Sequence, residues 1–277
     1  ANPDPNNPLT KSWFIYTAEI GREIKDQVRI VNLTDKTVRA KVFTADAVTT
    51  ADGAYTIKEE SDKRDIGAWI NLTENIIDLQ PKETKIIDFI LKVPANAEVG
   101  DHMGAIMVQE AGRLEEVKVG GVGVETGVKI AVRVGSRVYL TIPGEIIKNL
   151  LFKIFSWEGK DNRFYFNLEL ENTGNSRIEP RGEITLTNIL GQEIDKISIP
   201  HREVFPKDTI VLPVEWEKYS LLWARYGGLI AKAKVSYADK TLEQTINIFT
   251  VPWIELGALL GLIAIVVFVR KIKRKRV

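Results

Sequence analysis

The chain contains no cysteine and only two histidines among its 277 residues. Without cysteine, no disulfide can hold a folded domain together, and no group of residues has the spacing of a zinc site. His102 and His201 lie far apart in the sequence, and no G-x-S-x-G elbow presents a serine nucleophile. Carboxylate pairs such as Glu59 and Glu60 are expected in solvated loops. We therefore expect no catalytic residue, no metal site and no cofactor, while a glycosidase using two carboxylates stays open.

The sequence before residue 250 also lacks any long amphipathic helix, and alternating strands take its place. Phe164, Phe166, Leu168 and Leu170 alternate with polar side chains in RFYFNLELE (163–171). The same period of two occurs in VKIAVRV (128–134) and TIVLPVEW (209–216). This period is typical of sheets with one buried and one solvated face, so an all-β protein built from antiparallel sandwiches is predicted.

A weak internal repeat predicts two such sandwiches. LQPKETKIIDFILKV (79–93) is similar to VFPKDTIVLPVEW (204–216), and VRIVNLTD (28–35) is similar to LELENTGN (168–175). The order is the same in both halves, and Pro143-Gly144 supplies a break between them. We expect an N-terminal segment at 1–11, a first Ig-like domain at 12–143 and a second at 144–250.

The sequence after residue 250 is apolar and then strongly basic. No charged residue occurs from Leu256 to Val269, so a transmembrane helix is predicted at 251–270, with a basic cytoplasmic tail at 271–277. Gly257 and Gly261 form a GxxxG pattern that could let two such helices associate. The expected anchor residues are Trp253, Gly257, Gly261, Arg270, Lys271, Lys273, Arg274, Lys275 and Arg276.

The charge distribution predicts which side of the membrane each part occupies. The basic tail favours the cytoplasm, so the two domains are expected outside a cell membrane crossed once. Export needs a signal peptide, and we interpret Ala1 as the residue exposed by its removal. A tail-anchored cytosolic protein is the alternative. Without the six cations from Arg270 to Arg276, 32 basic residues stand against 37 acidic ones, which argues against nucleic acid as a partner.

Two long segments carry a resemblance to a known family. They are VRIVNLTDKTVRAKVFTADAVTTADGAY (28–55) and IIDLQPKETKIIDFILKVPANAEVGDHMGAIMV (76–108). Their Asn turn, their A-V-T-T-x-D-G segment and their V-P-x-x-A-x-x-G-D-x-x-G pattern resemble the WxL-interacting proteins of Gram-positive surfaces. The resemblance implies two Ig-like domains, a C-terminal membrane helix and peptidoglycan or cell-wall binding by the first domain. It also implies that the second domain meets host or partner proteins.

Candidate ligand-contacting residues in the second domain are Tyr219, Trp223 and Tyr226, within KYSLLWARYGG (218–228). Aromatic faces can stack on sugar rings or contact a protein partner. The alternative is a short helical turn that closes the end of the sandwich. Asn32 and Asn71 begin glycosylation sequons, and whether either is used is left open.

These features predict a membrane-anchored, non-catalytic surface protein that binds or scaffolds. Its expected partners are cell-wall polymer or another surface protein, and membrane lipid through the C-terminal helix. A membrane-tethered assembly chaperone for surface fibres, or a structural subunit of a larger membrane complex, are the alternatives.

Overall fold

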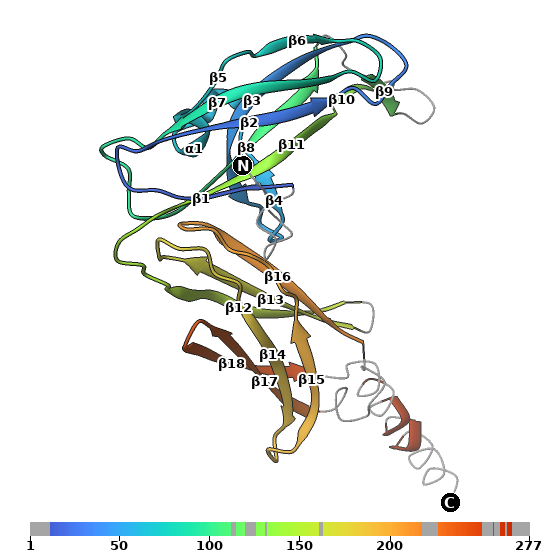
Figure 1. Ribbon diagram of the computed structural model, residues 1–277. Coiled ribbons are helices and arrows are strands. Elements are labelled where there is room, and N and C mark those ends of the chain that lie inside the picture. Colours follow the sequence, from blue (N-terminus) through green and yellow to red (C-terminus); the bar gives the residue numbers. More distant parts are fainter. Residues whose placement is uncertain are drawn as a thin grey trace, which may run out of the picture. The chain divides into compact units, whose positions relative to one another are not determined.

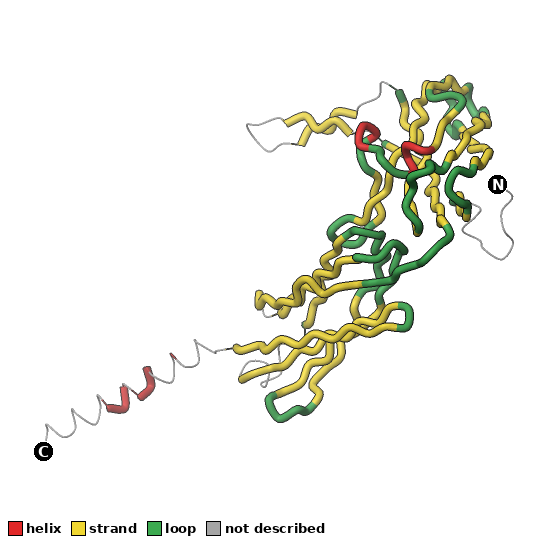
Figure 2. The backbone as a smooth tube through the Cα atoms, turned by 90° about the vertical axis from the view of Figure 1, so that its left-hand side faces the viewer, coloured by secondary structure: helices red, strands yellow, loops and turns green. Residues whose placement is uncertain are grey.

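The computed structural model describes residues 12–111, 115–119, 126–130, 132–160, 163–217, 227–250, 257, 261–263 and 265–267. Strands and loops make up almost all of this chain (Figure 2), so the all-β prediction is confirmed. Contacts divide it into two compact units. The first unit comprises 1–151, 171–179 and 202–210, and the second comprises 152–170, 180–201 and 211–277. Two short segments from the second half of the sequence thus belong to the first unit.

The first unit contains two sheets that pack face to face (Figure 1). One sheet has the order β1-β11-β8-β3-β4, with β6 also paired to β3. Its strands are β1 (Phe14–Thr17), β11 (Arg133–Ile142), β8 (Gly100–Glu110), β3 (Val38–Thr49), β4 (Tyr55–Ile57) and β6 (Ile76–Leu79). The other sheet has the order β2-β7-β5, made of β2 (Glu23–Val31), β7 (Thr84–Lys92) and β5 (Ile70–Leu72). A separate hairpin joins β9 (Glu115–Val119) to β10 (Thr126–Ile130).

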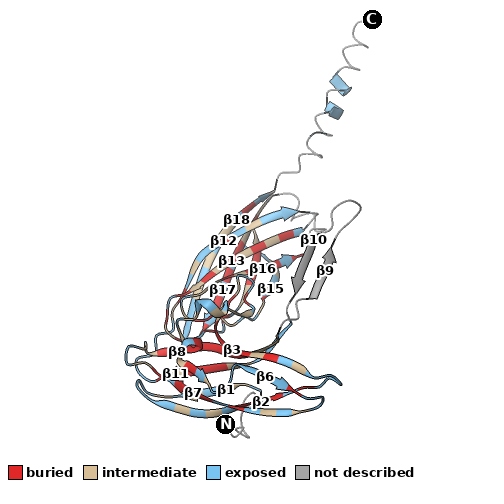
Figure 3. Cartoon of the chain, turned by 90° about the horizontal axis from the view of Figure 1, so that it is seen from above, coloured by how far each residue is buried: buried red, intermediate tan, exposed pale blue. Residues whose placement is uncertain are grey.

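Apolar side chains from both sheets form the core of the first unit. Phe89 and Leu91 of β7 pack in one cluster with Val42 of β3 and Leu140 of β11, and all four are at most 1% exposed. Burial is densest along β3 and β8 (Figure 3). A 3-10 turn, η2 (Glu60–Asp62), and a single helical turn, α1 (Ile66–Trp69), follow β4.

The second unit is also built from two sheets. One has the order β12-β13-β16 and the other β15-β14-β17-β18. The strands are β12 (Leu150–Lys160), β13 (Arg163–Asn172), β14 (Arg181–Asn188), β15 (Glu193–Ile199), β16 (Thr209–Trp216), β17 (Gly227–Tyr237) and β18 (Lys240–Thr250). The predicted buried face of β13 is confirmed, since Phe164, Phe166, Leu168 and Leu170 are all 0% exposed.

The prediction of one half-buried strand at 128–134 is wrong. The segment is divided between β10 and β11, and Val132 and Val134 are each 68% exposed. Period-two alternation shows that two faces differ in polarity, but it cannot show that another layer covers the apolar face.

The internal repeat appears in the structure as two corners with the same hydrogen bonds. The side-chain amide of Asn32 donates to the carbonyl oxygens of Lys36 and Leu79, and that of Asn172 donates to those of Ser176 and Val204. Lys82 and Lys207 have φ of 62° and 67° in the turns that follow.

The hydrogen bonds of the Asn32 corner also determine whether the glycosylation sequon at Asn32 can be used. Asn32 is 5% exposed, and its side-chain nitrogen donates to a third carbonyl, that of Gln80. Glycan attachment at that nitrogen is therefore incompatible with the folded corner. Asn71 is exposed on β5 and stays available.

Among the residues described here, no helix is both long and apolar enough to cross a membrane. The membrane helix at 251–270 therefore stays a prediction, as do the domain boundaries at 143 and 250.

Candidate functional site

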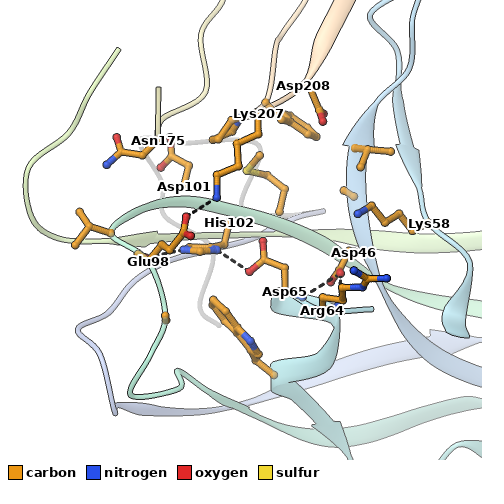
Figure 4. A pocket seen from close by; sticks show the side chains of 18 of the residues that line it. Asp46, Lys58, Arg64, Asp65, Glu98, Asp101, His102, Asn175, Lys207 and Asp208 are labelled. Carbon is orange, nitrogen blue, oxygen red and sulfur yellow. Dashed lines mark hydrogen bonds and ion pairs between the residues drawn. The ribbon is translucent and has the colours of Figure 1, made fainter. Parts of the chain in front are cut away.

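A pocket of about 580 Å³ lies in the first unit. Its lining comes from the end of β3, residues 64–69 around α1, the loop 94–99 and the start of β8, together with residues 205–208 and Asn175 (Figure 4). This volume falls within the range of small-ligand sites, which is roughly 300–1,000 Å³. The pocket contains both carboxylates and cations, so the partners of each charge decide what the pocket can bind.

Asp46 fixes the wall formed by α1. Its carboxylate accepts hydrogen bonds from the backbone N–H groups of Arg64, Asp65 and Gly67, at 2.6, 3.0 and 2.8 Å. The side chain is almost fully buried. Gly67 lies in α1, so its N–H is one of the donors that a helix start leaves unsatisfied, while Arg64 and Asp65 directly precede the helix. Gly67 lets α1 approach β3 closely, because a Cβ there would lie 2.5 Å from the carbonyl carbon of Ala45.

His102 forms part of the pocket floor with both ring nitrogens engaged. Nδ1 lies 2.6 Å from Oδ1 of Asp65, and Nε2 lies 2.9 Å from the carbonyl oxygen of Glu98. The ring also contacts Trp69, with centroids 4.7 Å apart. Burial opposes protonation, but the hydrogen bonds and negative charges of Asp65 and Glu98 together outweigh it, so the pKa of His102 is raised. Because both ring nitrogens are hydrogen-bonded within the protein, neither is available to take a proton from a substrate.

Asp101 holds the segment 171–179 in the first unit. Its carboxylate accepts from the hydroxyl of Thr141 at 2.6 Å, the hydroxyl of Ser176 at 2.7 Å and the N–H of Arg177 at 2.9 Å. Burial disfavours the charge, but these donors and the Arg177 cation stabilise it, so the pKa of Asp101 is lowered. This carboxylate is occupied by structural contacts rather than presented to a ligand.

The segment 202–210 supplies the opposite wall. Oδ2 of Asp208 accepts from the N–H of Thr49 at 2.5 Å, and the N–H of Phe205 donates to the Thr49 hydroxyl at 3.0 Å. Burial raises the pKa of Asp208 above the usual range for a carboxyl group. At the rim, Nζ of Lys207 lies 2.6 Å from Oε2 of Glu98, and both side chains are largely exposed.

Each carboxylate of the pocket is therefore already hydrogen-bonded or ion-paired, with backbone amides, hydroxyl groups, His102 or Lys207 as its partners. The cations Lys58, Arg64 and Lys207 line the same pocket. The Arg64 side chain is 84% exposed and forms an ion pair with the half-exposed Asp62 at 3.0 Å, a contact that an incoming anion can replace. Within the described ranges, no group of three or more His, Cys, Asp or Glu side chains could hold a metal ion. The arrangement suits a polar ligand that carries carboxylates.

A smaller hollow of about 310 Å³ lies between β4, β8 and β11. The guanidinium of Arg137 lies 4.0 Å from the ring centroid of Tyr55 and 4.8 Å from that of Trp13. Because the planar face of Arg137 is covered by these rings, this arginine stabilises the sheet surface and is poorly placed to bind a ligand.

The site residues predicted from the sequence are not those that line the pocket. Tyr219, Trp223 and Tyr226 fall outside the described residues, so their role in ligand contact stays a prediction. The anchor residues Trp253, Arg270, Lys271, Lys273, Arg274, Lys275 and Arg276 also fall outside them. Gly257 and Gly261 are helical and exposed, and no heavy atom lies within 4 Å of where a Cβ would stand. The pocket itself was missed, although its V-P-A-N-A-E-V-G-D-H segment carried the family resemblance.

A known protein family matches the part of the chain that contains most of the pocket. Residues 3–110 match the family described as "WxL Interacting Protein, peptidoglycan binding domain". In this region the chain is WxL-interacting-protein-like. The matched range contains β3, α1 and most residues that line the pocket. The family resemblance stated from the sequence is thus confirmed, while the two Ig-like domains and the membrane helix that it implies stay predictions.

Among solved structures, the chain is similar to several chaperones. The YadV chaperone is 12% identical with a TM-score of 0.38, covering 86% of this chain and 96% of that one. The CupB2 chaperone of Pseudomonas aeruginosa is 11% identical with a TM-score of 0.35, at 86% and 97% coverage. The E. coli chaperone DraB is 12% identical with a TM-score of 0.35, at 84% and 94% coverage. A comparison with curated protein sequences finds no match.

Proposed function

We propose that this protein is a non-catalytic surface protein that binds peptidoglycan through the pocket of its first unit. The observation that carries the proposal is the match of residues 3–110 to a peptidoglycan-binding family. The pocket supports it, because most of its lining lies in that range and exposed cations stand at its edge. Peptidoglycan stem peptides end in carboxylates, and guanidinium and ammonium groups bind carboxylates by charge-assisted hydrogen bonds.

The proposal includes a membrane anchor. The uncharged run from Leu256 to Val269 and the basic tail after it support a single-pass helix with the two Ig-like units outside the cell. The described residues of that run are helical, and Leu262, Ile265 and Val267 are 61%, 64% and 59% exposed. Apolar side chains exposed to this extent on a helix suit a lipid environment. Self-association through Gly257 and Gly261 belongs to the same proposal.

Co-sedimentation with insoluble peptidoglycan tests the binding role. Replacing both cations in a Lys58→Ala/Arg64→Ala variant should weaken binding by about tenfold or more, because each lost charge-assisted hydrogen bond contributes about 1.5–3 kcal/mol. The matched control is Arg39→Ala, which removes an exposed arginine paired with Asp78 at 3.9 Å outside the pocket. Equal binding by all three proteins would show that the pocket is not the site.

The same assay tests the non-catalytic part of the proposal. Soluble sugar or peptide fragments should stay at the level of a protein-free control after long incubation. Release of fragments that depends on the protein would contradict it.

A further inference from the structure

The second unit exposes an apolar patch at one end of its β15-β14-β17-β18 sheet. Ile189 and Leu190, in the turn between β14 and β15, are 72% and 78% exposed, and Phe249 near the end of β18 is 73% exposed. We call these three residues the tip patch. Exposed apolar groups that gather in this way mark contact surfaces for proteins or membranes.

The sheet register brings Ile189 and Phe249 together, and Leu190 follows Ile189 in the same turn. Asn188 pairs with Leu229 across β14 and β17, and Gly228 pairs with Phe249 across β17 and β18. A Cβ at Gly228 would lie 3.0 Å from Cγ2 of Ile189 and 3.5 Å from Cε1 of Phe249. Ile189 and Phe249 therefore flank the bare backbone of Gly228 and form one continuous surface.

The turn that carries Ile189 and Leu190 is held rigidly. Oδ1 of Asn188 accepts from the N–H groups of Leu190 at 3.0 Å and Gln192 at 2.9 Å. Gly191 takes the positive φ of 79° that the turn needs. Two large apolar side chains are thus presented on an ordered turn, where polar residues are the usual choice.

The position of the tip patch in the sequence favours a membrane rather than a protein as the surface that it contacts. Phe249 precedes Trp253 by four residues and the uncharged run at Leu256 by seven. Seven residues span at most about 25 Å and four at most about 14 Å, even when fully extended. An apolar surface within that reach of the proposed anchor lies at the height of the lipid headgroups. Isoleucine, leucine and phenylalanine all partition into the interface between headgroups and acyl chains.

We propose that the tip patch inserts into the outer lipid interface next to the membrane anchor. The sheet then has two attachments to the bilayer, one through the chain after Thr250 and one through the β14–β15 turn. Two attachments limit the rotation of the second unit about its anchor, which a single connecting segment cannot do. This inference rests on the proposed anchor.

Single-cysteine labelling tests the inference in the full chain, because the chain contains no cysteine of its own. Leu190→Cys and Phe249→Cys proteins, each carrying a small environment-sensitive fluorophore, are reconstituted into phosphatidylcholine–phosphatidylglycerol vesicles. A fraction of the lipid carries a nitroxide quencher at the headgroup. The control is Asp239→Cys in the β17–β18 turn, about 35 Å along β18 from Phe249 at the usual rise per residue. Fluorescence at 190 and 249 should be strongly quenched, and fluorescence at 239 should stay unchanged.

Flotation of the vesicles separates the two proposals. Protein that floats with the vesicles but is not quenched at 190 and 249 overturns the tip contact and leaves the anchor standing. A blue-shifted but unquenched probe also overturns it, because a protein then covers the patch. Protein that does not float overturns the anchor, and the tip contact with it. As a second readout, Ile189→Ser in the Leu190→Cys background should reduce quenching without preventing flotation.

Discussion

At the scale of single residues, His102 shows how neighbouring groups in the pocket stabilise a protonated side chain. A histidine with Asp65 on one nitrogen and a carbonyl oxygen on the other is stabilised as the cation, and the Glu98 carboxylate adds to this. A group whose pKa is raised by folding stabilises the protein fully below its unfolded pKa, here about 6.5, and that contribution is lost as the pH rises through the folded pKa.

The resulting prediction is a loss of stability as the pH increases from below 6.5 to above the raised pKa of His102. The free energy of unfolding, measured by urea denaturation across this range, should fall for the native protein. A His102→Gln variant should lack this part of the decrease. Identical pH profiles for the two proteins would mean that the pairing of His102 with Asp65 does not contribute.

The sequence pointed to the segment that contains His102 but not to its role. The V-P-A-N-A-E-V-G-D-H run supported the family resemblance, so the neighbourhood was found. Asp65 lies 37 residues earlier in the chain, and no spacing rule joins the two. A long-range pair of this kind needs the fold to bring α1 against β8.

At the scale of secondary-structure elements, the pocket depends on how a single helical turn is fixed to a strand. Four residues cannot form a stable helix by themselves, so α1 depends on tertiary contacts. Asp46 supplies them from β3 by accepting three backbone hydrogen bonds.

Replacing Asp46 with alanine should therefore destabilise the first unit by about 3 kcal/mol, because one buried and two part-buried donors lose their acceptor, at roughly 1 kcal/mol each. Urea denaturation gives the stability, and the co-sedimentation assay should show weaker binding as well. Asp62→Ala is the control. It removes an exposed partner of Arg64, so the stability should change by less than about 1 kcal/mol.

The alternation of apolar and polar residues predicted strands correctly where one face of the sheet packs against another layer. In β13 and β16 the apolar positions are buried, as Phe166 at 0% and Leu212 at 1% show. The same reasoning was wrong at Val132 and Val134 because no layer covers them among the described residues. The turn that presents Ile189 and Leu190 was not predicted, since two apolar residues beside a glycine do not show whether they face the core or the solvent.

At the scale of the whole molecule, the division into units does not follow the order of the sequence. The segment 202–210 belongs to the first unit, and the cluster around Phe205 shows why. Phe205 is 2% exposed and packs with Met103 and Tyr139 in one apolar cluster. Its ring also contacts Tyr55 edge to face, with centroids 5.7 Å apart. A sequence boundary at 143 could not reveal this, because the repeat that suggested it places Phe205 in the second half.

Two matched substitutions test this assignment. Phe205→Ala and Phe166→Ala each remove a buried phenylalanine, and each should lower stability by about 3–5 kcal/mol. They should act on different units, since Phe205 packs in the first and Phe166 lies in the second. Hydrogen exchange measured peptide by peptide should therefore speed up in β3 and β8 for Phe205→Ala, and in β13 and β14 for Phe166→Ala. If Phe205→Ala instead speeds exchange only in β13 and β14, residues 202–210 belong to the second unit, and the wall that they give the pocket is lost.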